Sequence, residues 1–172
     1  GDARTRPFAE PLLEAVVTLE IGGTQITIRQ EVEHRLVDRI RGEIRRRLDV
    51  VPAISVEPGT DLVVVPVSAG DAPRELLLTV RNNTTEDVAG RAQFEVPQGW
   101  VLEPPSAEFS LAAAPATTTL AFRVTMDPGV SAGEYKLAAN VTVNGTQYNK
   151  TMREIAYPHI RTHRIYSPSV TE

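Results

Sequence analysis

Residues 81–105 read RNNTTEDVAGRAQFEVPQGWVLEPP, a series that predicts the end of one strand, a polar turn, a second strand and a corner. Residues 82–85 are too polar to bury a core face, and Asn and Thr side chains bond readily to nearby backbone, so we expect a turn there. Residues 88–96 return to β-type residues, and Pro97 and Gly99 end that strand. The only tryptophan of the chain, Trp100, follows the corner, and we expect it to anchor a sandwich core.

Short apolar segments continue on the C-terminal side of this stretch at the spacing of an all-β fold. Asn144-Gly145, between two alternating runs, is the strongest short-range signal for a tight hairpin. Turn signals separate the other segments, and together they predict an immunoglobulin-like β-sandwich over residues 58–157. The expected strands cover residues 62–67, 75–80, 91–96, 109–111, 120–125, 134–143 and 147–155.

A smaller β unit is expected before the sandwich, over residues 1–57. Apolar and polar residues alternate over 13–21 and again over 26–32, and Gly22-Gly23 between them is typical of a two-residue hairpin turn. Pro52 and Pro58-Gly59 place the domain boundary near residues 52–60. Residues 158–172 are expected to form a C-terminal tail.

Residues 30–49 leave two readings open. Val32, Leu36, Ile40, Ile44 and Leu48 recur every four residues, which fits a helix face and also a strand face. A helix would gain good ion pairs, but it would place a glycine near its middle. We expect a strand, a turn over 38–42 and a second strand that continues over 48–56, and a helix is the alternative.

Composition excludes several classes of protein. The 172 residues hold no cysteine, so disulfides and thiolate metal sites are ruled out. A formal charge of −4 argues against nucleic acid as a partner. No apolar run reaches the ~18 residues that span a bilayer, so we expect no membrane segment.

No motif predicts catalysis, a cofactor or a metal. His159 and His163 have a spacing that serves zinc ligands on a helix, but Pro158 makes a helix unfavourable there and a third ligand is missing. The chain has neither a nucleophile elbow nor a phosphate-binding glycine loop. We therefore expect a non-enzymatic chain without a cofactor. Five Asn-x-Thr sequons are interpreted as turn sequences in exposed loops rather than as used glycosylation sites, and they begin at Asn82, Asn83, Asn140, Asn144 and Asn149.

Two groups of short motifs resemble known families, and the resemblance spreads over most of residues 7–168. The sandwich part is similar to the β-sandwich domain associated with α-galactosidases and neighbouring carbohydrate-binding modules. The flanking parts resemble the C-terminal region of large LmbE-like proteins, which are related to N-acetylglucosaminyl-phosphatidylinositol de-N-acetylases. The first resemblance rests on residues 82–84, 90, 94, 97–100, 104, 127–128 and 132–135, and the second on residues 44–56 and 155–160.

The second resemblance implies an accessory module of a larger, bacterial, exported or cell-envelope protein, whose catalytic domain would be its partner. That family's zinc site uses a His-Pro-Asp-Asp type motif, which this chain lacks, so no catalytic residue or metal carries over. The chain is expected to be a piece of such a longer protein. Carbohydrate binding through exposed aromatic rings is the alternative, with Trp100 and Tyr148 as candidate residues.

Self-association is a further alternative. Residues 12–57 supply only about three long strands, too few for a closed sandwich, and open strand edges need cover. The cover would come from an upstream segment, from the sandwich or from a second copy of the chain. The sequence thus predicts packing on the sandwich or a homodimer.

Overall fold

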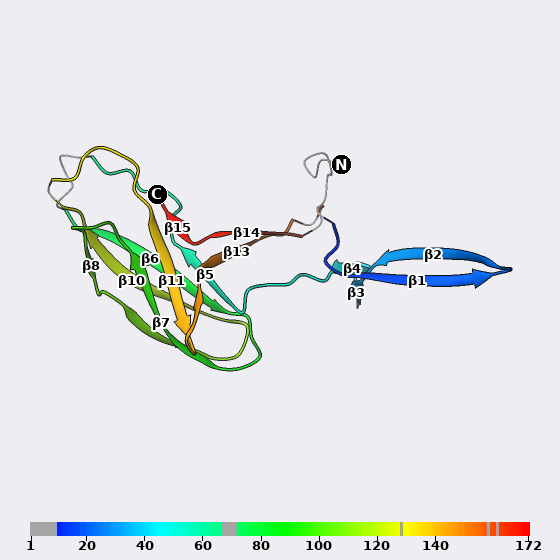
Figure 1. Cartoon of the computed structure of the whole chain (residues 1–172). Coiled ribbons are helices and arrows are strands. Elements are labelled where there is room, and N and C mark those ends of the chain that lie inside the picture. The colour runs from blue at the N-terminus through cyan, green and yellow to red at the C-terminus, as the bar shows by residue number, and fades with distance from the viewer. Residues whose placement is uncertain (1–9, 67–71, 128, 158, 161) are drawn as a thin grey trace. The chain divides into compact units, whose positions relative to one another are not determined.

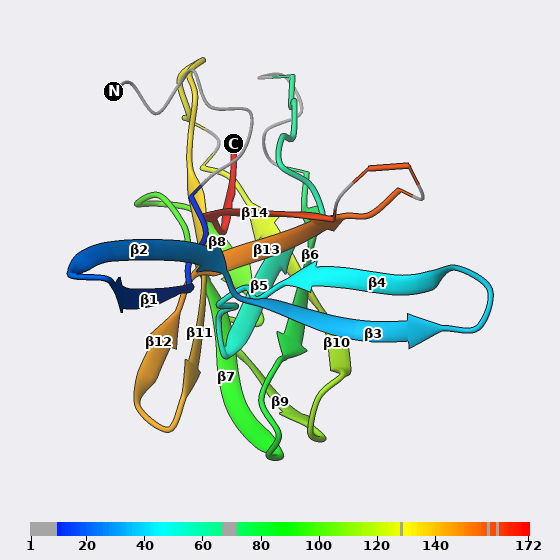
Figure 2. The same ribbon diagram turned by 90° about the vertical axis from the view of Figure 1, so that its right-hand side faces the viewer.

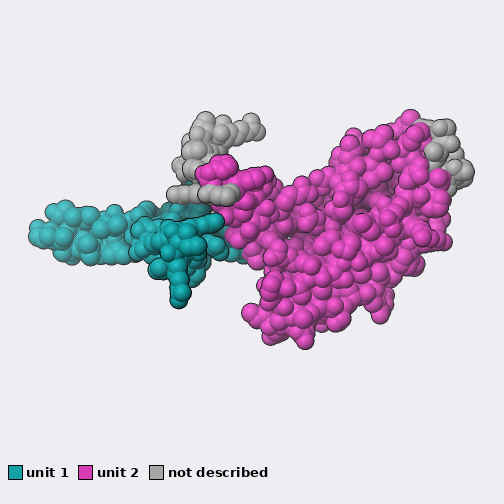
Figure 3. All heavy atoms as spheres, turned by 180° about the vertical axis from the view of Figure 1, so that it is seen from behind, with its two compact units in different colours: residues 1–50 teal, residues 51–172 magenta. Residues whose placement is uncertain are grey.

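The computed structural model describes residues 10–66, 72–127, 129–157, 159–160 and 162–172. All regular elements in these ranges are β-strands, so the all-β prediction is confirmed. The chain divides into two compact units, residues 1–50 and residues 51–172, which Figure 3 shows in different colours.

The first unit begins with the predicted hairpin. Strand β1 (Glu14–Ile21) pairs antiparallel with β2 (Thr24–Glu31), and Gly22 and Gly23 connect them with φ of 61° and 80°. Positive φ at both central residues suits a turn whose twist matches the twist of the strands, and glycine adopts it without a steric cost. The prediction of this hairpin is confirmed.

Residues 33–47 form a second hairpin, so the helix alternative for 30–49 is wrong. Strand β3 (Glu33–Asp38) pairs with β4 (Gly42–Arg47), and Leu36 lies opposite Ile44. The Asp38 carboxylate accepts hydrogen bonds of 2.8 Å from the backbone N–H groups of Ile40 and Arg41 and so stabilises the turn. These bonds lower the pKa of Asp38. Of the five residues with four-residue spacing, Leu36 and Ile44 therefore lie on one side of the two strands, and Ile40 lies in the turn.

The second unit is a β-sandwich of two antiparallel sheets (Figures 1 and 2). The first sheet has the order β5-β6-β10-β8, with β5 (Ile54–Pro58), β6 (Arg74–Asn82), β10 (Ala116–Thr125) and β8 (Val101–Glu103). The second sheet has the order β12-β11-β7-β9, with β12 (Thr146–Tyr148), β11 (Leu137–Val143), β7 (Val88–Glu95) and β9 (Ala107–Leu111). The short strand β15 (Val170–Thr171) also pairs with β11.

The core lies between these sheets, because alternate side chains of each strand point inward. Leu76, Leu78 and Val80 of β6 are buried and alternate with more exposed neighbours. Phe122 from the first sheet meets Phe94 from the second edge to face, with ring centroids 5.4 Å apart. Each such side chain contributes about 1.5–3 kcal/mol by its burial. Burial of these alternate side chains therefore holds the two sheets together as a sandwich. That the sandwich is immunoglobulin-like stays a prediction.

Asn82 and Asn83 stabilise neighbouring loops because their side chains donate hydrogen bonds to backbone carbonyl oxygens. Asn82 is fully buried, and its Nδ2 donates to the carbonyl oxygens of Glu86 and Ala112 at 2.8 Å each. Asn83 donates to the Pro52 carbonyl oxygen at 2.9 Å. Asn140 is also buried, so the expectation that all five sequons lie in exposed loops is wrong.

The unit boundary falls between residues 50 and 51 rather than after residue 57. Strand β5 pairs with β6 and its Ile54 and Val56 are buried in the core, so this segment belongs to the sandwich. The strand predicted over 48–56 is wrong for residues 48–53, which lie between β4 and β5. The described part of the predicted strand 62–67, residues 62–66, is not assigned as a strand.

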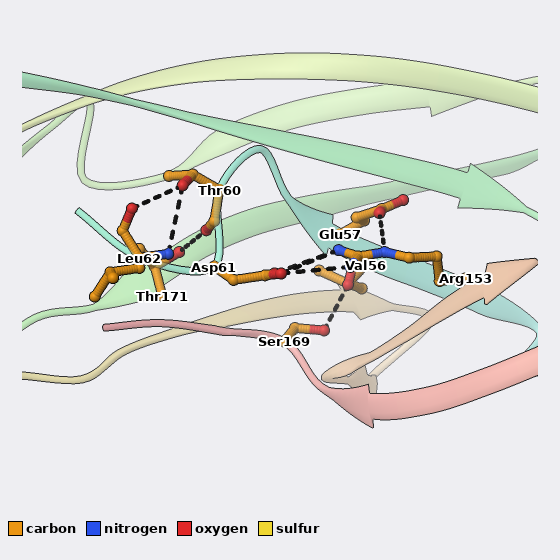
Figure 4. A network of polar contacts seen from close by, with 8 residues as sticks. All are labelled: Val56, Glu57, Thr60, Asp61, Leu62, Arg153, Ser169 and Thr171. Carbon is orange, nitrogen blue, oxygen red and sulfur yellow. Dashed lines mark hydrogen bonds and ion pairs between the residues drawn. The ribbon is translucent and has the colours of Figure 1, made fainter.

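The C-terminal residues also belong to the sandwich, so the prediction of a tail over 158–172 is wrong for the described part. The predicted strand 147–155 is broken at Asn149 into β12 and β13 (Lys150–Ile155), and β13 pairs with β14 (His163–Pro168). The chain then returns to β11 as β15. Ser169 and Thr171 are both 1% exposed. Their hydroxyl groups donate to the carbonyl oxygens of Val56 at 2.5 Å and of Thr60 at 2.9 Å (Figure 4).

Candidate functional site

A cavity of about 420 Å³ opens at one end of the sandwich, and we call it the end cavity. Its lining includes residues near the start of β6, the end of β10 and the start of β11, which meet at this end. The first two strands belong to one sheet and the third to the other, so the end cavity lies between the sheets. Its buried lining residues include Leu76, Val124, Met126 and Leu137.

Two aromatic rings also line the end cavity. Trp100 and Tyr135 lie with ring centroids 5.2 Å apart and an interplanar angle of 45°. Both side chains are half-buried, and Trp100 packs against the core, so the expected role of Trp100 as a core anchor is confirmed in part. The Tyr135 hydroxyl group donates to the Ser131 carbonyl oxygen at 3.0 Å, which holds the ring in the connection between β10 and β11.

A glycine corner positions Trp100. The Trp100 N–H donates to the Pro97 carbonyl oxygen at 3.1 Å, and Gly99 between them has φ of 86°. This positive φ favours glycine, and a Cβ atom here would lie 2.7 Å from Asp127 Oδ2, so it would also displace that carboxylate. The Pro-Gln-Gly-Trp motif therefore works as a tight turn that delivers the indole ring to this end of the sandwich.

An extended segment, residues 62–66, forms another wall of the end cavity. Its backbone is joined to the C-terminal residue: Val63 N donates to Glu172 O at 2.7 Å, and Glu172 N donates to Asp61 O at 3.0 Å. Figure 4 shows how Arg153 contacts this region, with distances of 3.3 Å to Asp61 and 3.4 Å to Glu57. These carboxylates raise the pKa of Arg153. Since these pairs are exposed, each contributes little to stability.

Charged groups border the end cavity with balanced signs. Arg74, Glu134 and Glu172 belong to its lining. Lys136 Nζ lies 2.8 Å from Glu172 Oε1 and 3.9 Å from Glu134 Oε1. The hydrogen bond to Glu172 raises the pKa of Lys136. The rim therefore carries no strong excess of either charge.

Tyr148, the other predicted carbohydrate-binding residue, lies elsewhere. It sits on β12 opposite Val141, is half-buried and packs against the core. Strand β12 lies beside β11 (Figure 2) and pairs with its last residues. The lining of the end cavity includes the first residue of β11, Leu137. The structure therefore does not bring Trp100 and Tyr148 together. Tyr135, which does lie beside Trp100, was not one of the two residues predicted to bind carbohydrate.

A second candidate surface lies in the first unit. The register of β1 and β2 places five apolar side chains on one side of the hairpin, and we call them the hairpin face. Their exposed fractions run from 41% to 62%. Polar residues dominate the opposite side, where Glu14 and Arg29 form an ion pair of 3.5 Å. The hairpin face consists of Val17, Leu19, Ile21, Ile26 and Ile28.

The two histidines near the C-terminus do not form part of a metal site within the described residues. No group of three or more His, Cys, Asp or Glu side chains in those ranges could hold a metal ion. His159 stacks on Tyr157 with ring centroids 6.0 Å apart, and His163 begins β14. A search of the described residues also finds no helix of the length and apolar character that crossing a membrane requires.

Comparison with protein-family models gives no match for this chain, and comparison with curated proteins gives none either. The similarity to LmbE-like proteins and to the α-galactosidase-associated domain therefore rests on the short motifs quoted above.

Proposed function

We propose that the chain is a non-catalytic accessory module that works by contact with another protein surface, within a larger LmbE-like, deacetylase-related protein. The observation that carries this proposal is the hairpin face, which exposes five large apolar side chains on one side of β1 and β2. The expected partner is the catalytic domain of the parent chain, as the family resemblance implies.

The first unit has little to stabilise it alone. Among residues 10–50 none is buried. Isolated two-stranded hairpins are marginally stable in water and need a further layer over their apolar side. Since the five side chains are each about half exposed, a partner that covers them would contribute roughly 5 kcal/mol. That gain exceeds what surface ion pairs on the polar side supply.

Carbohydrate binding by Trp100 and Tyr148 has weaker support. The two rings lie in different parts of the sandwich, and both are half-buried rather than displayed as a row on one sheet. Sugar recognition needs ring faces surrounded by polar groups that are open to the ligand. The contact module is therefore the function that the geometry supports best, and a homodimer through the hairpin face is one form of it.

Amide hydrogen exchange tests the proposal. We expect fast exchange at β1 and β2 in the isolated chain, and strong protection of both strands when the chain is studied in its parent polypeptide. Ile28→Glu should remove that protection because it places a charge on the hairpin face, whereas Thr27→Glu on the polar side should retain it.

Light scattering on the isolated chain separates the forms of contact. A dimer that Ile28→Glu dissociates identifies a second copy as the partner. A monomer that already protects β1 and β2 refutes the proposal, because the hairpin would then need no partner. Equal exchange in a monomeric isolated chain and in the parent refutes it as well.

A further inference from the structure

We propose that the end cavity is a binding site for a small, uncharged, apolar molecule of the size of one or two rings. The site belongs to the sandwich and does not depend on the hairpin face. Its volume of about 420 Å³ falls in the range of about 300–1,000 Å³ that is typical of small-molecule sites.

The walls favour apolar ligands. Leu76, Val124, Met126 and Leu137 supply buried aliphatic or thioether surface from both sheets. The segment 62–66 has the sequence Leu-Val-Val-Val-Pro and adds no charged side chain. Next to these apolar walls water finds few of the two to four polar partners that it needs, so an apolar ligand can displace it favourably.

Several polar groups around the end cavity already have partners within the protein. The Tyr135 hydroxyl group donates to Ser131 O, and the Thr171 hydroxyl group donates to Thr60 O. The Glu172 backbone pairs with Asp61 and Val63, and its carboxylate contacts Lys136. A sugar brings several hydroxyl groups that would each need a partner, and leaving them unpaired opposes binding. This commitment of the polar atoms argues for an apolar ligand over a carbohydrate.

The aromatic pair gives the ligand a polarizable contact at the wall. Trp100 and Tyr135 meet at 45°, and both retain partial exposure where they line the end cavity. Aromatic rings prefer tilted or offset contacts with other rings, so an aromatic ligand fits such a wall better than a linear aliphatic chain. Because the charges of the rim are balanced, neither an anion nor a cation is favoured.

Methyl NMR with toluene as the probe tests this inference. We expect saturable shifts at the methyl groups of Val124, Met126 and Leu137, with a Kd in the millimolar range for so small a ligand. The methyl groups of Val143, at the other end of β11, are the internal reference and should not shift. Methyl β-glucoside and methyl β-N-acetylglucosaminide, tested in parallel, should give no saturable shift.

Matched variants locate the binding. Ala132→Phe adds a ring at a residue that lines the end cavity, and it should weaken toluene binding at least about tenfold by filling the space. Ala121→Phe adds the same ring at an exposed position on β10 and should leave the Kd unchanged. If Ala132→Phe does not fold, Gly133→Leu replaces it, because a Cβ there meets the Tyr135 ring at an ordinary 3.7 Å.

Each result of the toluene titrations either supports or overturns the inference. The absence of a saturable shift with toluene overturns the inference, and so does a Kd that Ala132→Phe and Ala121→Phe change equally. Saturation by a glycoside in place of toluene overturns the ligand class. The Ile28→Glu variant should bind toluene unchanged, so a failure of the contact module and a failure of the end cavity are distinguishable.

Discussion

Replacing Asn82 by Ala should destabilise the sandwich strongly, although the residue lies next to a polar turn. The side chain is fully buried at the end of β6. Its Nδ2 donates to the carbonyl oxygens of Glu86 and Ala112, and its Oδ1 accepts from the N–H and hydroxyl groups of Thr84 at 2.9 and 2.8 Å. One amide thus joins the strand end to two different loops.

The magnitude follows from these four bonds. Each contributes about 1 kcal/mol net, and a buried group that loses its partner costs about 1–3 kcal/mol. Thr84 is half-buried and regains part of its loss from water, so we expect a loss of about 3 kcal/mol in the free energy of unfolding. For a unit of this size, that loss lowers the Tm by about 10 °C.

Urea unfolding followed by Trp100 fluorescence is a suitable assay, because the only tryptophan lies in the sandwich and reports on that unit alone. The midpoint should fall while the m-value stays constant. Asn149→Ala, at an exposed asparagine, is the control and should change the stability by less than about 0.5 kcal/mol. A loss for Asn82→Ala that equals the control would refute the view that this amide secures both loops.

Two further predictions concern local geometry. A Cβ atom at Gly90 would lie 2.5 Å from the Thr142 carbonyl oxygen, so Gly90→Ala should lower the free energy of unfolding, measured in urea, by about 1–3 kcal/mol. Gly133→Ala, where a Cβ atom meets only ordinary contacts, should lower it much less. Equal losses for the two variants would contradict the predicted clash. The two backbone hydrogen bonds to Asp38 lower its pKa, so its contribution to the β3–β4 turn is present above the unfolded-state pKa and is lost as the pH falls through the folded value. An NMR titration of this carboxyl group should have its midpoint below the ordinary value of 3.8, and a midpoint at or above 3.8 would refute this account.

Local sequence signals predicted much of the fold because they depend on near neighbours. Gly22-Gly23 and Asn144-Gly145 adopt positive φ in two-residue turns, as the chemistry of tight hairpins requires. Alternation of apolar residues marked β6, β7, β10 and β11, whose inward sides form the core. The strand-turn-strand prediction for residues 30–49 is confirmed over residues 33–47, where Leu36 and Ile44 lie opposite each other and Gly42 adopts the positive φ that the turn needs.

Pairing between distant segments could not be read in the same way. The sequence separates Ile54–Pro58 from the sandwich by a Pro-Gly turn, yet β5 joins β6 as part of the first sheet. Residues 169–171 resemble a polar tail, but they return to β11 after the β13–β14 hairpin and become buried. No local pattern encodes that return, because β15 pairs with a strand that is distant in the sequence and because two of the hydrogen bonds that hold it are made with residues more than a hundred positions earlier.

For the candidate sites, too, some features follow from local sequence and others only from the packing of distant segments. The sequence by itself determined that Trp100 follows a glycine corner and that β1 and β2 carry most of their large apolar residues on one side, since the first depends on turn chemistry and the second on the period of two. Only the tertiary structure decided that Tyr135 rather than Tyr148 lies beside Trp100, and that a cavity remains between the sheets there. The physical reason is that a cavity is made by strand ends and loops distant in the sequence, and their meeting depends on how the two sheets pack.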